Sequence, residues 1–127
     1  MSFIEVPDKE LFEDGVILIR KFSWEIRDNV FGLYRLEGEQ HIVPCVYKKV
    51  LSFKNGFARV IDMACNLKYV GENGNIIFDS ELPFIPELCD DFDENGIAQI
   101  ACLVDGYKIV KGFMDTDGAM FLKGYNC

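Results

Sequence analysis

The chain has 127 residues, half of them apolar, and a formal net charge of −8 at neutral pH. This length and composition fit one folded domain over residues 1–127 and argue against a disordered chain. The negative charge, without any cluster of Lys and Arg, argues against a protein that binds the nucleic-acid backbone. Acidity of this kind suits solubility or a basic partner.

The N-terminal segment carries early acids and no apolar run, so we expect no signal peptide. No stretch approaches the roughly 20 apolar residues of a membrane span, so we expect no membrane partner. The cysteines are irregularly spaced and include no Cys-x-x-Cys pair, which leaves a zinc site unsupported. We therefore expect a cytoplasmic protein with reduced, mostly buried thiols and no cofactor. The cysteines are Cys45, Cys65, Cys89, Cys102 and Cys127.

A phrase with a turn glycine recurs three times along the chain, about 40 residues apart. In each copy a phenylalanine precedes the glycine by three or four residues, and an apolar or alternating run follows it. The copies read FEDGVILI at 12–19, FKNGFARV at 53–60 and FDENGIAQI at 92–100. Self-similarity at a fixed period is typical of repeat architectures.

A second phrase follows each first one and centres on Gly38, Gly74 and Gly118. A large apolar residue lies five positions before each of these glycines. Six of the eleven glycines follow Asp or Asn, a pair that supplies the positive φ angles of tight hairpin turns. Each unit therefore predicts a strand, a variable connector, a strand, a tight turn and a strand.

We predict an all-β fold of three tandem antiparallel β-hairpin repeats of about 40 residues, stacked into one small domain. The repeats span roughly 3–44, 45–84 and 85–124. Helical periodicity is weak throughout the chain. The first repeat is expected to act as a cap, because its connector at 20–30 is irregular.

The stretch FGLYRLEGEQHIVPCVYKKVLSFKNGFARV resembles the WG-repeat family of bacterial proteins. In that family a Trp-Gly-aromatic-Ile phrase precedes a turn glycine, an apolar pair with proline, a Tyr-x-x-Val-x-x-Phe phrase and Gly-Leu-Ala-x-Val. The counterparts here are Phe31-Gly32-Leu33-Tyr34, Gly38, Ile42-Val43-Pro44, Tyr47-Val50-Phe53 and Gly56-Phe57-Ala58-Val60. Phe31, Leu67 and Lys111 replace the signature Trp, as in a divergent member. The resemblance implies a binding or scaffolding module and carries no shared catalytic centre.

The segment before the third turn has the highest density of acids in the chain, five within eight residues. Such a run is usually a solvated loop face, and its functional interpretation is a patch that steers a basic partner. DFDENG at 91–96 matches the first half of a calcium-loop pattern, but Cys102 replaces the expected Glu. We interpret it as an acidic hairpin turn and predict no metal site. The five acids are Glu87, Asp90, Asp91, Asp93 and Glu94.

His41 is the only histidine, so a Ser–His or Cys–His pair would have to use it. It follows a turn, with Cys45 four residues further on, and we expect it at the surface. Among the acids, only Asp62 and Glu25 lie between apolar residues, and we expect Asp62 to cap a turn. Glycine-rich phosphate loops are absent. We predict no catalytic residues.

Four aromatic residues exceed what three thin hairpins need: Phe22, Trp24, Tyr34 and Tyr47. They either fill the core or form a binding patch. We predict a non-catalytic protein-binding module, in particular an acidic inhibitor or immunity-type protein, whose partner-binding residues are Trp24 and the five acids of 87–94. A self-assembling structural module and a small enzyme with a pocket between hairpins remain alternatives. The oligomeric state stays open.

Overall fold

The computed structural model describes residues 2–5, 12–13, 15–72, 74–77 and 83–123. These residues form an all-β fold with one short 3₁₀ turn, η1 (Pro86–Leu88), which confirms the predicted fold class. The strands are β1 (Ser2–Glu5), β2 (Val16–Ser23), β3 (Asp28–Arg35), β4 (Gln40–Tyr47), β5 (Lys49–Lys54), β6 (Phe57–Ile61), β7 (Leu67–Gly71), β8 (Ile97–Val104), β9 (Lys108–Asp115) and β10 (Met120–Leu122).

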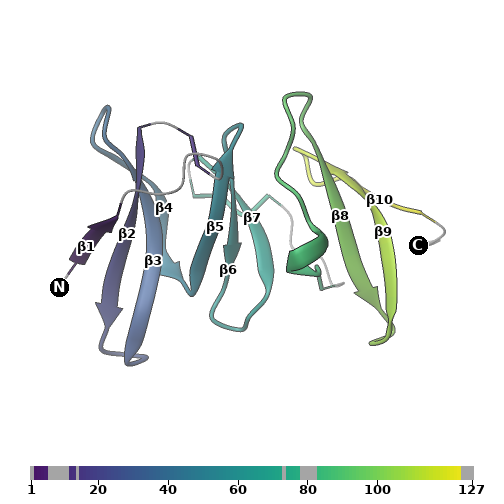
Figure 1. Cartoon of the computed structure of the whole chain (residues 1–127), viewed down its shortest axis with the longest axis horizontal. Coiled ribbons are helices and arrows are strands. Elements are labelled where there is room, and N and C mark those ends of the chain that lie inside the picture. The colour runs from purple at the N-terminus through teal and green to yellow at the C-terminus, as the bar shows by residue number, and fades with distance from the viewer. Residues whose placement is uncertain (1, 6–11, 14, 73, 78–82, 124–127) are drawn as a thin grey trace.

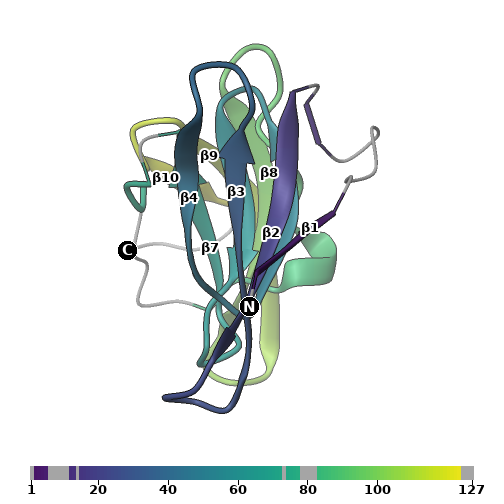
Figure 2. The same cartoon turned by 90° about the vertical axis from the view of Figure 1, so that its left-hand side faces the viewer.

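The strands form three antiparallel sheets of sequential neighbours. Sheet A has the order β1-β2-β3-β4, sheet B the order β5-β6-β7, and sheet C the order β10-β9-β8. The three sheets follow one another along the long axis of the molecule, as Figure 1 shows. Figure 2 looks down this axis, with sheet A in front of the strands of sheets B and C. The architecture is therefore a stack of three sheets.

Sheet B contributes side chains to both hydrophobic cores of the described residues. Ala58 and Val60 of β6 lie in the core shared with sheet A. Phe57 and Ile61 of the same strand pack against the core shared with sheet C. Side chains alternate between the two faces of a strand, so one apolar strand can serve two cores.

The phenylalanine that precedes each repeated turn glycine is a core residue. Phe12, Phe53 and Phe92 are 7%, 0% and 1% exposed. Phe12 forms a parallel bridge with Phe53, which joins the entry of sheet A to sheet B. The ring of Phe92 lies 4.7 Å from that of Phe57 and 5.3 Å from that of Tyr69. The repeated phenylalanines therefore tie neighbouring sheets together.

All six Asp-Gly and Asn-Gly glycines have a positive φ, as predicted. Asn55-Gly56 has positive φ at both residues and joins β5 to β6 as a two-residue hairpin turn. Asp105-Gly106 also has positive φ at both residues, within the three-residue connection between Val104 and Lys108. Four other turns share a second pattern, in which the N–H of the first residue donates to the carbonyl of the fifth. These turns start at Asp62, Gly71, Asp93 and Asp115.

The fourth position of this second turn type is left-handed, and it is occupied by glycine in three of the four turns. Cys65 stands there in the turn that starts at Asp62, with a φ of 69°. A residue with a side chain is destabilised by about 1–2 kcal/mol in this left-handed conformation. Glycine avoids this cost, but it also increases the conformational entropy of the unfolded chain, which offsets part of the gain. We therefore expect Cys65→Gly to raise the free energy of unfolding by about 0.5–1 kcal/mol.

Urea unfolding of Cys65→Gly against the wild type measures this gain. Cys65→Ala is the matched control, because it also removes the thiol, which lies 3.2 Å from the Lys48 ammonium, but keeps the Cβ. Equal stability of the Gly and Ala variants would contradict a backbone origin.

Two glycines lie in strand interiors, where the backbone of the adjacent strand approaches closely. A Cβ on Gly32 of β3 would lie 2.5 Å from the Val43 carbonyl oxygen of β4 and 2.8 Å from the Cys45 nitrogen. A Cβ on Gly112 of β9 would overlap the Phe121 carbonyl of β10. Glycine inside a strand typically marks such a close approach. In sheet B the matching residue is Lys68 of β7. Among the described residues, the strand that would follow β7 is represented by an isolated bridge between Val70 and Ile76.

Candidate protein-binding surface

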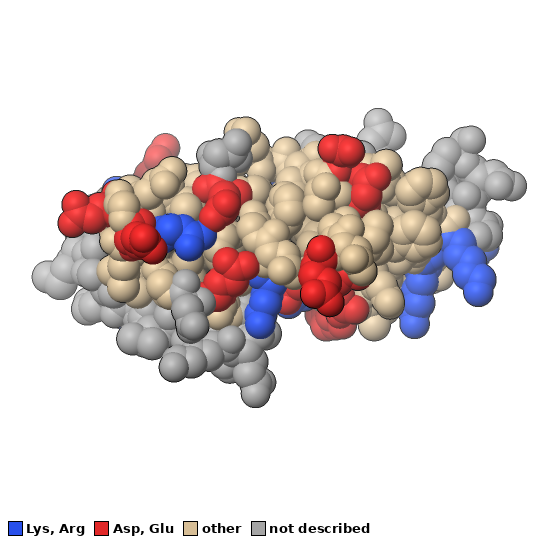
Figure 3. All heavy atoms as spheres, turned by 90° about the horizontal axis from the view of Figure 1, so that it is seen from above, with Lys and Arg blue, Asp and Glu red and all other residues tan. Residues whose placement is uncertain are grey.

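One edge of the stack, the upper edge in Figure 1, is formed by turns from all three sheets. We call it the turn edge and define it by its exposed acids. Figure 3 shows this side of the molecule, where acidic side chains are spread along the stack and basic ones are few. The Arg35 guanidinium on this edge is already paired with the Glu72 carboxylate. The acids of the turn edge are Glu37, Glu39, Glu72, Asp93, Glu94 and Asp117.

The predicted acidic run at 87–94 has one inward-facing member, Asp91, whose side chain is 23% exposed. Its carboxylate accepts a hydrogen bond from Arg59 Nε at 2.9 Å and another from the Ser52 hydroxyl. Arg59 also donates to the carbonyl of Cys89. Ser52 and Arg59 belong to sheet B, so Asp91 holds the segment that leads into sheet C and is not presented to a partner.

Asp93 is exposed and caps its own turn. Its Oδ1 accepts hydrogen bonds from the backbone N–H groups of Asn95 at 2.9 Å and Ile97 at 3.0 Å. DFDENG is thus a capped hairpin turn, as interpreted from the sequence. Within the described parts of the chain, no group of three or more His, Cys, Asp or Glu side chains is placed to hold a metal ion.

The remaining acids of the run, Glu87, Asp90 and Glu94, are exposed. Glu87 lies in η1, whereas Glu94 lies in the turn that starts at Asp93, which is part of the turn edge. The backbone N–H of Asp90 donates to the Gln99 carbonyl of β8, and the side chain of Asp90 is exposed. Four of the five predicted acids are therefore accessible: Glu87, Asp90, Asp93 and Glu94.

Trp24 lies far from the acidic run, in the turn between β2 and β3 at the opposite edge of the stack (Figure 1). It is 81% exposed, and its ring meets that of Phe22 edge-on at 4.8 Å. Tyr107, in the corresponding turn between β8 and β9, is also 81% exposed. The structure thus does not join Trp24 to the acids in one patch. Tyr107 escaped the sequence analysis, although its place directly after Asp105-Gly106 puts it at a hairpin tip.

The other aromatic candidates divide between core and surface. Tyr47 is 7% exposed and belongs to the core between sheets A and B. Phe22 and Tyr34 are half-buried. Tyr47 therefore fills the core and is unavailable to a partner.

His41 and Cys45, the residues considered for a catalytic Cys–His pair, contact other groups in the structure. His41 is exposed, as expected, and its ring meets Tyr34 edge-on at 5.0 Å. The Cys45 thiol points to the Ile19 carbonyl at 3.9 Å, and burial raises its pKa. Burial also raises the pKa of the Cys102 thiol, to about 11, which keeps it protonated at neutral pH.

Asp62 caps a turn, as predicted. Its Oδ1 accepts hydrogen bonds from the N–H groups of Ala64 and Asn66, each at 2.9 Å. Lys68 lies 3.5 Å from its other oxygen. Each oxygen of the Asp62 carboxylate therefore has its own partner in the fold.

The sequence matches no family model, no curated protein and no solved structure. In the described ranges no helix has the length and apolar character needed to cross a membrane.

Proposed function

We propose that this chain is a non-catalytic protein-binding module that presents the turn edge to a basic partner surface. An inhibitor or immunity-type protein is the form of this function that we favour, acting in the cytoplasm by covering the partner. The thiols of Cys45, Cys65, Cys89 and Cys102 are free, which supports a reducing compartment.

The observation that carries the proposal is the distribution of exposed acids over turns of all three sheets. Hairpin turns held by backbone hydrogen bonds fix these carboxylates along one edge, so little ordering is needed on binding. Carboxylates so arranged raise the association rate with a basic surface and exclude acidic partners. Such binding weakens as salt screens the charges.

We further propose that the chain is built from three β-hairpin repeats of about 40 residues, related to WG repeats. The buried phenylalanines Phe12, Phe53 and Phe92 support this, because each precedes a positive-φ glycine by three or four residues. The strand interiors of β3 and β9 add a glycine at the same position, Gly32 and Gly112.

A pull-down with two variants of equal charge tests the function. The turn-edge variant carries Glu37→Gln, Glu39→Gln and Glu94→Gln, none of which holds a turn in the described structure. The control variant carries Glu25→Gln, Asp28→Asn and Asp105→Asn, which neutralise three exposed acids at the opposite edge. Asp91 and Asp93 are left intact because they stabilise the fold.

Each immobilised chain is exposed to an extract of its native host, and captured proteins are quantified at low and high salt. A basic protein retained by the wild type and the control, but retained about tenfold less by the turn-edge variant, supports the proposal. Equal capture by both variants, or capture that salt does not affect, would rule out the turn edge as the binding surface.

A further inference from the structure

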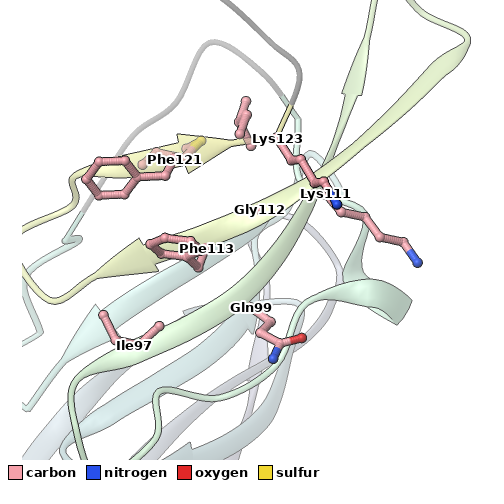
Figure 4. Close-up of a pocket in the computed structure, with 9 residues that line it drawn as sticks. Ile97, Gln99, Lys111, Gly112, Phe113, Phe121 and Lys123 are labelled. Carbon is pink, nitrogen blue, oxygen red and sulfur yellow. The ribbon is translucent and has the colours of Figure 1, made fainter.

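The outer face of sheet C, which points away from sheet B, forms an apolar groove of about 930 Å³. Phe113 and Phe121 are 45% and 55% exposed, and their rings stack at 5.2 Å. Figure 4 shows the two rings side by side on β9 and β10, with Ile97 and Gln99 of β8 next to them. Exposed large apolar side chains that contact each other are typical of a surface that binds a partner, because covering them removes apolar area from water.

The same positions are covered elsewhere in the chain. When the turn glycines are aligned, Ile97, Phe113 and Phe121 match Phe57, Tyr69 and Ile77 of sheet B. Those three residues pack in the core between sheets B and C, and Tyr69 is 1% exposed. The groove is therefore the kind of face against which this protein stacks another sheet.

Charge along the groove is ordered. Lys111, Phe113 and Asp115 alternate along β9 and so share its outer face. Lys123 lies beside Lys111, because its N–H donates to the Lys111 carbonyl. One end of the groove is thus positive and the aromatic pair lies at its centre. The acidic turn of Asp115 and Asp117 lies just beyond the other end, where Asp115 pairs with Ile97 of the groove.

We propose that this groove binds a second copy of the chain, sheet C against sheet C, with β9 antiparallel to its counterpart across a two-fold axis. Phe113 lies two residues from Lys111 and two from Asp115, so an axis near Phe113 places each lysine over the partner's acidic turn. The aromatic pairs then stack on each other at the centre.

The charge order selects this arrangement over its parallel counterpart. A two-fold axis along the strands would place Lys111 of one copy over Lys111 of the other, and like charges facing each other are destabilising. The antiparallel arrangement forms two sets of opposite-charge contacts instead. This interface shares only Asp117 with the turn edge, and the turn-edge variant leaves Asp117 unchanged, so either surface can fail its test without affecting the other.

Sedimentation equilibrium of the full chain tests the interface. We expect the mass to rise with concentration to twice the 14.5 kDa of one chain. Phe113→Ser with Phe121→Ser should abolish dimers, whereas the control Trp24→Ser with Tyr107→Ser removes exposed aromatics elsewhere and should leave them intact. Circular dichroism confirms that each variant folds. A wild type that stays monomeric, or dimers that survive the Phe113 and Phe121 changes, would overturn the proposal.

A charge-swap experiment tests the two-fold geometry. Lys111→Glu with Lys123→Glu, and separately Asp117→Lys, should each weaken the homodimer at least about tenfold through like-charge contacts. Asp117 is changed instead of Asp115 because the Asp115 carboxylate caps the turn. Mixing the two variants should restore dimers, because the acidified end of the first variant then faces the lysine introduced at position 117 of the second. Asp117 of the first variant faces the unchanged Lys111 and Lys123 of the second. A mixture that stays monomeric would overturn the antiparallel two-fold.

Discussion

Gly32→Ala should destabilise the protein by about 3 kcal/mol or more, a loss typical of backbone clashes that side-chain rotation cannot relieve. The new Cβ would lie 2.5 Å from the Val43 carbonyl oxygen and 2.8 Å from the Cys45 nitrogen, both in the backbone of β4. To make room, β4 would have to move away from β3. That movement would expose Ile42 and Val43, which are 2% and 0% exposed in the core between sheets A and B.

Urea unfolding of Gly32→Ala and of Gly112→Ala measures the effect in two sheets. Lys68→Ala is the matched control, because Lys68 holds the corresponding position in sheet B and already has a Cβ. It removes the ion pair of Lys68 with Asp62 but no backbone contact, and should lower the free energy of unfolding by no more than about 1 kcal/mol. If the two glycine variants were as stable as the control, the close approach of the neighbouring strands would be absent in solution.

Asp91→Ala should cost about 2–3 kcal/mol, the second largest effect we expect. The substitution leaves the Arg59 guanidinium, 15% exposed, without its carboxylate, and leaves the fully buried Ser52 hydroxyl without its acceptor. The cost stays below that of a fully buried pair because water reaches both side chains in part.

The neighbouring acid provides the control for this prediction. Asp90→Ala removes an equal charge from an exposed side chain and should shift the free energy of unfolding by less than about 0.5 kcal/mol. In the double variant Asp91→Ala with Arg59→Met, the buried charge is removed as well, so the loss should be smaller than the sum of the single losses. Similar stability of Asp91→Ala and Asp90→Ala would contradict the structural role of Asp91.

Sequence reasoning predicted the all-β class and the turn glycines because both depend on local chemistry. A positive φ after Asp or Asn and an alternating apolar run are determined by a few adjacent residues, as at Asn55-Gly56. The buried phenylalanines were found because one recurs three or four residues before each of those turns. The strand expected after β7 is represented in the described residues by a single bridge at Ile76, which was not anticipated because nothing local distinguishes its turn from the others.

The candidate site was predicted less completely, because its arrangement depends on contacts distant in sequence. Asp91 looked like one more surface acid until Arg59, 32 residues away, was found beside it. Trp24 is exposed, so of the two interpretations offered for it the core one is wrong, and it lies at the opposite edge from the turn of Glu94. That separation depends on which end of the strands each turn lies at, which only the folded arrangement shows.

The two-sided burial of sheet B has a consequence for how the molecule comes apart. Because β6 supplies both cores, loss of either outer sheet would expose half of its apolar side chains to water. The outer sheets are therefore thermodynamically coupled through a strand of five residues. Damage at one end of the molecule is expected to lower hydrogen-exchange protection at the other, so that the stack opens as a single cooperative unit.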